Sequence, residues 1–85
     1  MKTLVLIERG ADGRYGVFTA DLLSTIIGEG ENVVEAKLDF ENSYKEVVQA
    51  YLESGEELPE ELRDIEFEYK FDIASLFNYF DFINV

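Results

Sequence analysis

The alternation of apolar and polar residues predicts three short strands in the first third of the chain. Residues 2–8 are rich in β-branched and other apolar side chains and end before a turn-forming Gly-Ala-Asp-Gly run. A second strand is predicted over residues 14–20, so that a hairpin joins the first two strands. A third is predicted over residues 24–27. We interpret the Gly-Glu-Gly-Glu run at 28–31 as a turn between this strand and a helix.

From Asn32 onward the apolar period changes from two to about 3.6, which indicates an amphipathic helix. Asn32 is placed to cap this helix by accepting from the backbone N–H of Glu35. The Glu35 carboxylate is expected to bond back to the Asn32 backbone, as in a capping box. Gly55 is a natural residue to end the helix. The predicted buried stripe consists of Ala36, Phe40, Tyr44, Val47, Val48 and Tyr51.

A fourth strand is predicted after an acidic connection that contains Pro59 and that we expect to be too acidic to pack. In it, Ile65, Phe67, Tyr69 and Phe71 alternate with Glu66, Glu68 and Lys70, so the first set is expected to be buried. The first strand differs, because residues 4–7 are apolar on both faces. We therefore expect the first strand to be central in the sheet.

These elements predict an α+β fold of order β-β-β-α-β, with one long helix on a four-stranded mixed sheet. The helix would carry the chain across the sheet, so that the fourth strand lies parallel to the first. We assign this domain to residues 1–71. Residues 72–85 are expected to form a short aromatic-rich helix, with Asp72 as its N-cap.

The segment 72–85 has two interpretations. Its stripe of Ile73, Leu76, Phe77, Phe80 and Ile83 would cover the second face of the sheet in one interpretation. In the other, the segment is a subunit interface or a contact with a further domain. We favour a homodimer or higher oligomer, because the first strand is apolar on both faces and both faces of the sheet would then need to be covered. The predicted interface residues are Phe77, Tyr79, Phe80 and Phe82.

The charge of the chain is large and unevenly placed. The 85 residues carry a net charge of −12, and residues 31–85 hold −11 of it. Such a surface repels phosphate backbones, so we expect no nucleic-acid binding by this segment. It would speed the encounter with a basic partner, although a solubilising surface explains it equally simply. We expect this partner contact at the acids Glu53, Glu56, Glu57, Glu60 and Glu61.

The residue types narrow the chemistry further. The chain has no cysteine, which removes disulfides, thiolate metal sites and cysteine nucleophiles. The apolar run before Glu8 is too short for a signal peptide or membrane span, so we expect a cytoplasmic protein without membrane contact. Glu8, Asp12, Asp21 and Glu66 are the candidate magnesium ligands. Glu8 and Asp12 flank a turn, Glu66 falls on the wet face of its strand, and no histidine is available as a base. We therefore expect no catalytic, metal or cofactor-binding residues.

Two motifs follow one another in the first half of the chain. The first is Tyr-Gly-Val-Phe-Thr-Ala-Asp-Leu at residues 15–22, an aromatic-rich strand followed by an Asp-Leu turn. The second is Gly-Glu-Asn-Val-Val-Glu-Ala at residues 30–36, a glycine before a capped helix. In this order the two motifs resemble the HicB antitoxin family. Residues 71–85 resemble the lead-in to a C-terminal helix-turn-helix in one branch of that family. The turn at residues 20–24 lacks the two prolines and the glycine that members commonly have.

This resemblance implies a fold like a partial ribonuclease H or double-stranded-RNA-binding-like domain that inhibits without catalysing. Such antitoxin domains bind HicA, a small basic toxin that cleaves mRNA, and cover its catalytic surface. Relatives also repress their operon through a C-terminal DNA-binding domain, which would follow Val85; the chain would then be truncated before it, or be a solitary sensor-like domain. The alternative function is a dimerisation or ligand-sensing domain of a transcription regulator.

Overall fold

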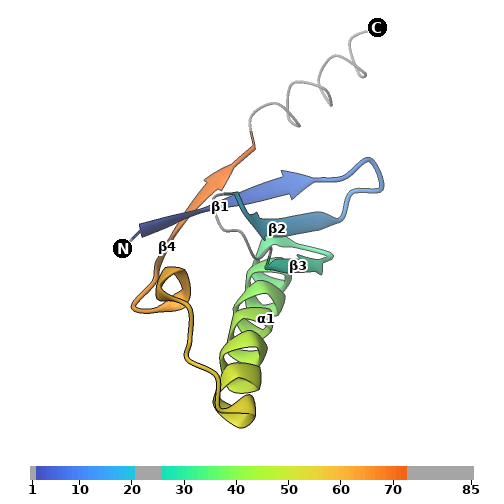
Figure 1. Cartoon of the computed structure of the whole chain (residues 1–85). Coiled ribbons are helices and arrows are strands. Elements are labelled where there is room, and N and C mark those ends of the chain that lie inside the picture. Colours follow the sequence, from blue (N-terminus) through green and yellow to red (C-terminus); the bar gives the residue numbers. More distant parts are fainter. Residues whose placement is uncertain (1, 21–25, 73–85) are drawn as a thin grey trace, which may run out of the picture.

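The described residues form two layers, a four-stranded sheet and a long helix packed against one of its faces (Figure 1). The computed structural model describes residues 2–20 and 26–72. The elements, in chain order, are β1 (Lys2–Arg9), β2 (Tyr15–Thr19), β3 (Ile27–Gly30), α1 (Val33–Ser54), the 3-10 helix η1 (Glu60–Leu62) and β4 (Glu66–Phe71). The predicted α+β class, with a mixed sheet of four strands and one long helix, is confirmed. The predicted helix within 72–85 lies outside the described residues.

The strand order is β3-β2-β1-β4, with β1 in the centre as predicted. β1 pairs antiparallel with β2, and β2 pairs antiparallel with β3. β4 pairs parallel with β1, from Lys2 opposite Glu66 to Ile7 opposite Phe71. A parallel neighbour requires a crossover connection, and α1 provides it. β1 is one residue longer than predicted at its end, and β2 is one residue shorter than predicted at each end.

The hairpin between β1 and β2 turns at Gly13, which has a φ of 82° in the left-handed region that favours glycine. The Gly10 N–H donates to the Arg14 carbonyl at 2.8 Å, and the Gly13 N–H donates to the Gly10 carbonyl at 3.0 Å. Asp12 adds a side-chain bond, because its Oδ1 accepts from the Arg14 N–H at 3.0 Å. The turn is therefore held by local hydrogen bonds.

The third strand was predicted over residues 24–27, of which the structure describes only Ile26 and Ile27, and the predicted turn at residues 28–31 was wrong. β3 runs over Ile27–Gly30, so the glycines at 28 and 30 belong to the strand and do not form a turn before the helix. A Cβ on Gly28 would fall on the backbone nitrogen of Phe40 and within 2.7 Å of the Ala36 carbonyl oxygen. A Cβ on Gly30 would lie 2.7 Å from the backbone nitrogen of Ala36. The glycines are there because α1 rests directly on the backbone of β3.

The ends of α1 are close to those predicted. Asn32 is the N-cap, and its Oδ1 accepts from the Glu35 N–H at 2.9 Å. The return bond differs from the predicted capping box: Glu35 Oε2 accepts from the N–H of Glu31 at 3.1 Å, one residue before Asn32. Gly55 follows the helix with a φ of 74°, as the C-cap prediction requires.

The core lies between the sheet and α1. Its buried apolar side chains are Val5, Ile7, Val17, Ile26, Ala36, Phe40 and Leu62. Phe40 is at its centre, with Phe67 at 5.0 Å and Tyr69 at 6.2 Å between ring centroids, both edge to face. The predicted burial of the fourth strand holds only in part. Phe67 and Tyr69 are half-buried against this core, whereas Phe71 is 51% exposed because it lies at the far end of β4.

Candidate functional site

The five acids predicted to bind a partner lie together at the end of α1 and in the connection after it. This group, the acidic end, consists of Glu53, Glu56, Glu57, Glu60 and Glu61. At about 1.5 Å per residue, the 22 residues of α1 span roughly 33 Å, and the last turns extend past the short strand β3 (Figure 1). The acidic end therefore projects away from the sheet.

The connection that carries these acids is packed, contrary to the prediction. Leu62 of η1 is fully buried in the core, and Leu58 packs partly against it. The Tyr44 hydroxyl donates to the Leu62 carbonyl at 2.8 Å, which joins the middle of α1 to η1. The acids face outward around this buried leucine. In the sequence Leu62 is a single apolar residue next to several acids, and a single residue forms no pattern from which burial could be predicted.

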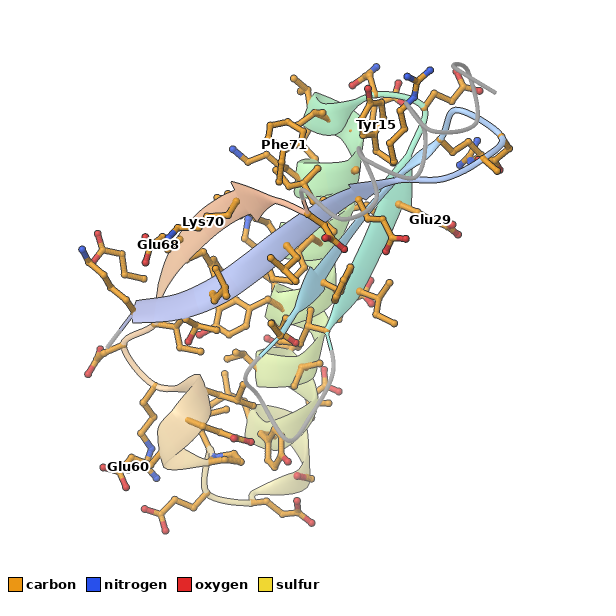
Figure 2. All side chains as sticks on the ribbon, turned by 90° about the horizontal axis from the view of Figure 1, so that it is seen from above. Tyr15, Glu29, Glu60, Glu68, Lys70 and Phe71 are labelled. Carbon is orange, nitrogen blue, oxygen red and sulfur yellow. The ribbon has the colours of Figure 1, made fainter. Side chains whose placement is uncertain are left out.

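The members of the acidic end differ in how available they are. Glu57 Oε1 accepts from the Arg63 guanidinium at 2.7 Å, and Arg63 also donates to the Leu58 carbonyl at 2.7 Å. Glu61 is half-buried. Glu53 accepts from Gln49 at 3.2 Å on the helix surface. Glu56 and Glu60 are exposed, and Figure 2 shows Glu60 at the end of the molecule away from the sheet. Glu53, Glu56 and Glu60 are thus the exposed carboxylates that do not pair with Arg63, whereas the Glu57 side chain is 86% exposed but engaged in that pair.

A second polar group joins α1 to β4. The Tyr69 hydroxyl donates to Glu41 Oε1 at 2.8 Å, and Lys37 Nζ lies 4.1 Å from the centroid of the Tyr69 ring. Burial of the phenol raises the pKa of Tyr69 well above its ordinary value, and the hydrogen bond and negative charge of Glu41 raise it further. This group holds the edge strand β4 to the helix, which is a structural role.

The face of the sheet away from α1 is the other distinctive surface. Successive side chains of a strand point to opposite faces, so the burial of Val5, Ile7 and Val17 against α1 turns their neighbours outward. The register sets Leu6, Phe18 and Ile27 opposite one another on β1, β2 and β3. We call this side of the sheet the open face; its apolar residues are Leu4, Leu6, Phe18 and Ile27.

Charged residues surround the apolar part of the open face. Glu68 and Lys70 lie on β4, opposite Leu4 and Leu6, and their side chains approach to 3.4 Å. Glu8 and Glu29 lie on the next row, at either side of Gly16. Figure 2 shows Glu68 and Lys70 together on β4 and Glu29 on the other edge strand. The sequence indicated that β1 is apolar on both faces. That Phe18 and Ile27 lie in one row with Leu6 could be known only from the register of the three strands.

The acids considered as metal ligands are not brought together. Glu66 lies beside Lys2 at the start of β1, whereas Glu8 is six residues farther along, about 20 Å away at strand spacing. Asp12 is in the hairpin turn and bonds to the Arg14 backbone. Asp21 lies outside the described residues. Within residues 2–20 and 26–72, no group of three histidine, cysteine or carboxylate side chains is placed to hold a metal ion.

The predicted oligomer interface at Phe77, Tyr79, Phe80 and Phe82 also lies outside the described residues. Comparison with family models, curated proteins and solved structures found no match to this chain. The resemblance to the HicB family therefore rests on the sequence motifs. Among the residues that the structure describes, no helix has the length and apolar character needed to cross a bilayer.

Proposed function

We propose that this domain is a non-catalytic antitoxin module of the HicB type, which binds and neutralises a small basic mRNA-cleaving toxin of the HicA type. The strand order is the observation that supports it best. Three strands form a meander, a helix crosses over, and β4 then pairs parallel with β1. A partial ribonuclease H-like fold, which the resemblance implies, has this sequence of elements. The proposal also implies a cytoplasmic protein that forms a homodimer or higher oligomer.

The acidic end is the proposed contact with the toxin. A ribonuclease must present positive charge to its RNA substrate, and this chain holds 19 acidic residues against 7 basic ones. Opposite charge accelerates association and orients the two proteins. Glu53, Glu56 and Glu60 are carried on a helix end and on a connection that Leu62 anchors, so their backbone is held in place before binding.

The test is inhibition of mRNA cleavage by a purified HicA-family ribonuclease. The wild-type chain is expected to inhibit cleavage at a stoichiometric ratio, with affinity that falls as salt rises. Replacing Glu53, Glu56 and Glu60 by lysine is expected to weaken binding about tenfold or more at low salt. These three positions avoid the Glu57 contact with Arg63, so the connection should keep its structure.

Two controls separate a specific contact from general charge attraction. The variant with Glu8, Glu29 and Glu46 changed to lysine has the same net charge as the first variant, but its changes lie on β1, β3 and mid-helix. It should inhibit nearly as well as the wild type. Cytochrome c, a small basic protein that does not cleave RNA, should bind far more weakly than the toxin. Equal loss in both triple variants, or no inhibition by the wild type, would sink the proposal.

A further inference from the structure

The open face is left without a covering layer by the described elements. α1 and the connection with η1 both lie on the other side of the sheet (Figure 1). Ile27 is 60% exposed, although it lies in one apolar row with Leu6 and Phe18. An apolar row that runs from an inner strand to an edge strand, with charged residues beside it, is typical of a surface that packs on another element.

The dimensions of this surface suit one helix. Strands lie about 4.8 Å apart, so the row from Leu6 to Ile27 is about 10 Å wide. Leu4 extends the apolar surface by two residues along β1, which is about 7 Å. A helix with its side chains is about 10–12 Å across. The open face therefore offers room for a single short amphipathic helix rather than for a second sheet.

The chain itself contains a segment of this kind after β4. Residues 73–85 carry the stripe Ile73, Leu76, Phe77, Phe80 and Ile83, which sequence periodicity assigns to one side of a helix. Asp81 is the one charged side chain in these thirteen residues, in a chain that is 31% charged. The acids Glu8, Glu29 and Glu68 around the open face would repel this segment, with its single acid, much less than the acidic segments of the chain.

The end of β4 indicates which copy of the sheet receives the segment. The Asp72 N–H donates to the Ile7 carbonyl at 2.8 Å, so the ladder with β1 continues to Asp72. Asp72 is also the predicted N-cap, which leaves no residue between the ladder and the helix. Connections that reverse the chain between a strand and a helix usually take 2–6 residues. The predicted helix therefore lacks the connecting residues with which a segment turns back onto the face of its own sheet.

We propose that two copies of this chain exchange their segments 73–85, each segment packing on the open face of the other copy. Phe77 and Phe80 of one copy then contact the row of Leu6, Phe18 and Ile27 of the other. The acidic end lies at the C-terminal end of α1 and in the connection after it, away from the sheet (Figure 1). It therefore stays accessible when a segment of the other copy covers the open face. The exchange does not depend on the identity of the toxin or on the antitoxin function.

Sedimentation equilibrium on the full 85-residue chain tests the exchange. The wild type is expected to be a dimer. Ile27→Asp on the open face, and separately Phe77→Asp with Phe80→Asp on the segment, should each raise the dimer Kd at least about 100-fold, because every contact is lost twice. Leu38→Asp is the matched control, since Leu38 is similarly exposed at 55% but lies on α1. It should leave the dimer intact.

Mixing the open-face variant with the segment variant tests the exchange directly. Each variant alone should be a monomer. In the mixture, the unchanged segment of the Ile27→Asp chain can pack on the unchanged open face of the Phe77→Asp, Phe80→Asp chain. A heterodimer is therefore expected in the mixture. Circular dichroism on each variant shows that it is folded, and the milder Ile27→Ser replaces Ile27→Asp if that chain is not.

Isotope-filtered NMR on a mixture of labelled and unlabelled wild-type chains decides between exchange and self-covering. Contacts between the Phe80 ring and the Ile27 methyl groups should appear between chains. A wild-type monomer, a dimer that the open-face variants leave unchanged, or contacts found only within one chain would each overturn the proposal.

Discussion

The two faces of the sheet differ in how they use glycine and aromatic residues. On the helix side, Gly28 and Gly30 remove side chains so that the backbone of α1 rests on β3, and Phe40 fills the space beside them. On the open face, Gly16 has no atom within 4 Å of where a Cβ would be, and Phe18 is half-buried. Glycine and phenylalanine are thus closely packed on the helix side of the sheet and less closely packed on the open face.

This difference shows that a small acidic domain can place its closely packed core on one face of its sheet. α1, β3 and the connection with Leu62 form a closed core on the helix side. We propose that the open face packs on a segment of a second copy and that the acidic end binds a partner. On this proposal stability and recognition use separate surfaces, and substitutions on each should have different consequences.

The largest expected effect breaks the helix side at Gly28. A Gly28→Val side chain would overlap the backbone of Phe40, and backbone cannot move aside as a flexible side chain can. We expect a loss of at least about 3 kcal/mol in the free energy of unfolding, measured by urea denaturation. Gly16→Val is the control on the other face and should change stability by less than about 1 kcal/mol. Equal losses at the two glycines would contradict the comparison.

The next effect compares two phenylalanines. Phe40→Ala removes the ring at the centre of the helix-side core, where it is fully buried, and should cost about 3–5 kcal/mol. Phe18→Ala on the open face should cost clearly less at low protein concentration. If the open face is covered by a second copy, the cost of Phe18→Ala should increase with protein concentration, which urea denaturation at two concentrations measures.

A third effect concerns the buried leucine under the acidic end. Leu62→Ala should cost about 2–5 kcal/mol, because the side chain is fully buried. The substitution should also expose the connection to proteolysis, since Leu62 anchors it to the core. Leu52→Ala, at a leucine that is 69% exposed, should change stability by about 0.5 kcal/mol or less. A small cost at Leu62 would mean that the connection is not packed in solution.

The smallest expected effect is a pH dependence of stability that arises where Tyr69 of β4 contacts Glu41 of α1. The raised pKa of Tyr69 means that the folded state favours the protonated phenol. Its contribution is fully present below the unfolded pKa of about 10 and is lost as pH rises above that value. Thermal unfolding should therefore show wild-type stability falling above about pH 10. Tyr69→Phe should cost about 1 kcal/mol at neutral pH and show a shallower fall. An identical alkaline slope in both chains would exclude this contribution.

Much of the fold could be predicted from local patterns. The helix from its Asn32 cap to Gly55, the central place of β1 and the alternation in β4 follow from periodicity and capping residues, and the structure has them. β3 was misplaced because glycine is usually read as a turn residue. Its role here, close approach of α1, appears only when the helix and the strand are seen together.

The two surfaces were harder to predict from the sequence than the helix and the strands. The acids of the acidic end were identified from charge, but the pairing of Glu57 with Arg63 and the burial of Leu62 depend on how the connection folds back on α1. The open-face row requires the register of three strands, and Ile27 was expected at the end of β3 rather than at its start. Register depends on the apolar pattern together with turn geometry, and the pattern alone did not fix where β3 begins against β2.

We propose that recognition of a toxin uses the acidic end and leaves the open face to the chain itself. A titration of the ¹⁵N-labelled chain with a catalytically inactive HicA-family ribonuclease, followed by amide chemical shifts, tests this division. We expect shifts concentrated in residues 53–61, with the amides of Leu6, Phe18 and Ile27 unmoved. Shifts concentrated on those three residues, with the acidic end unaffected, would contradict it.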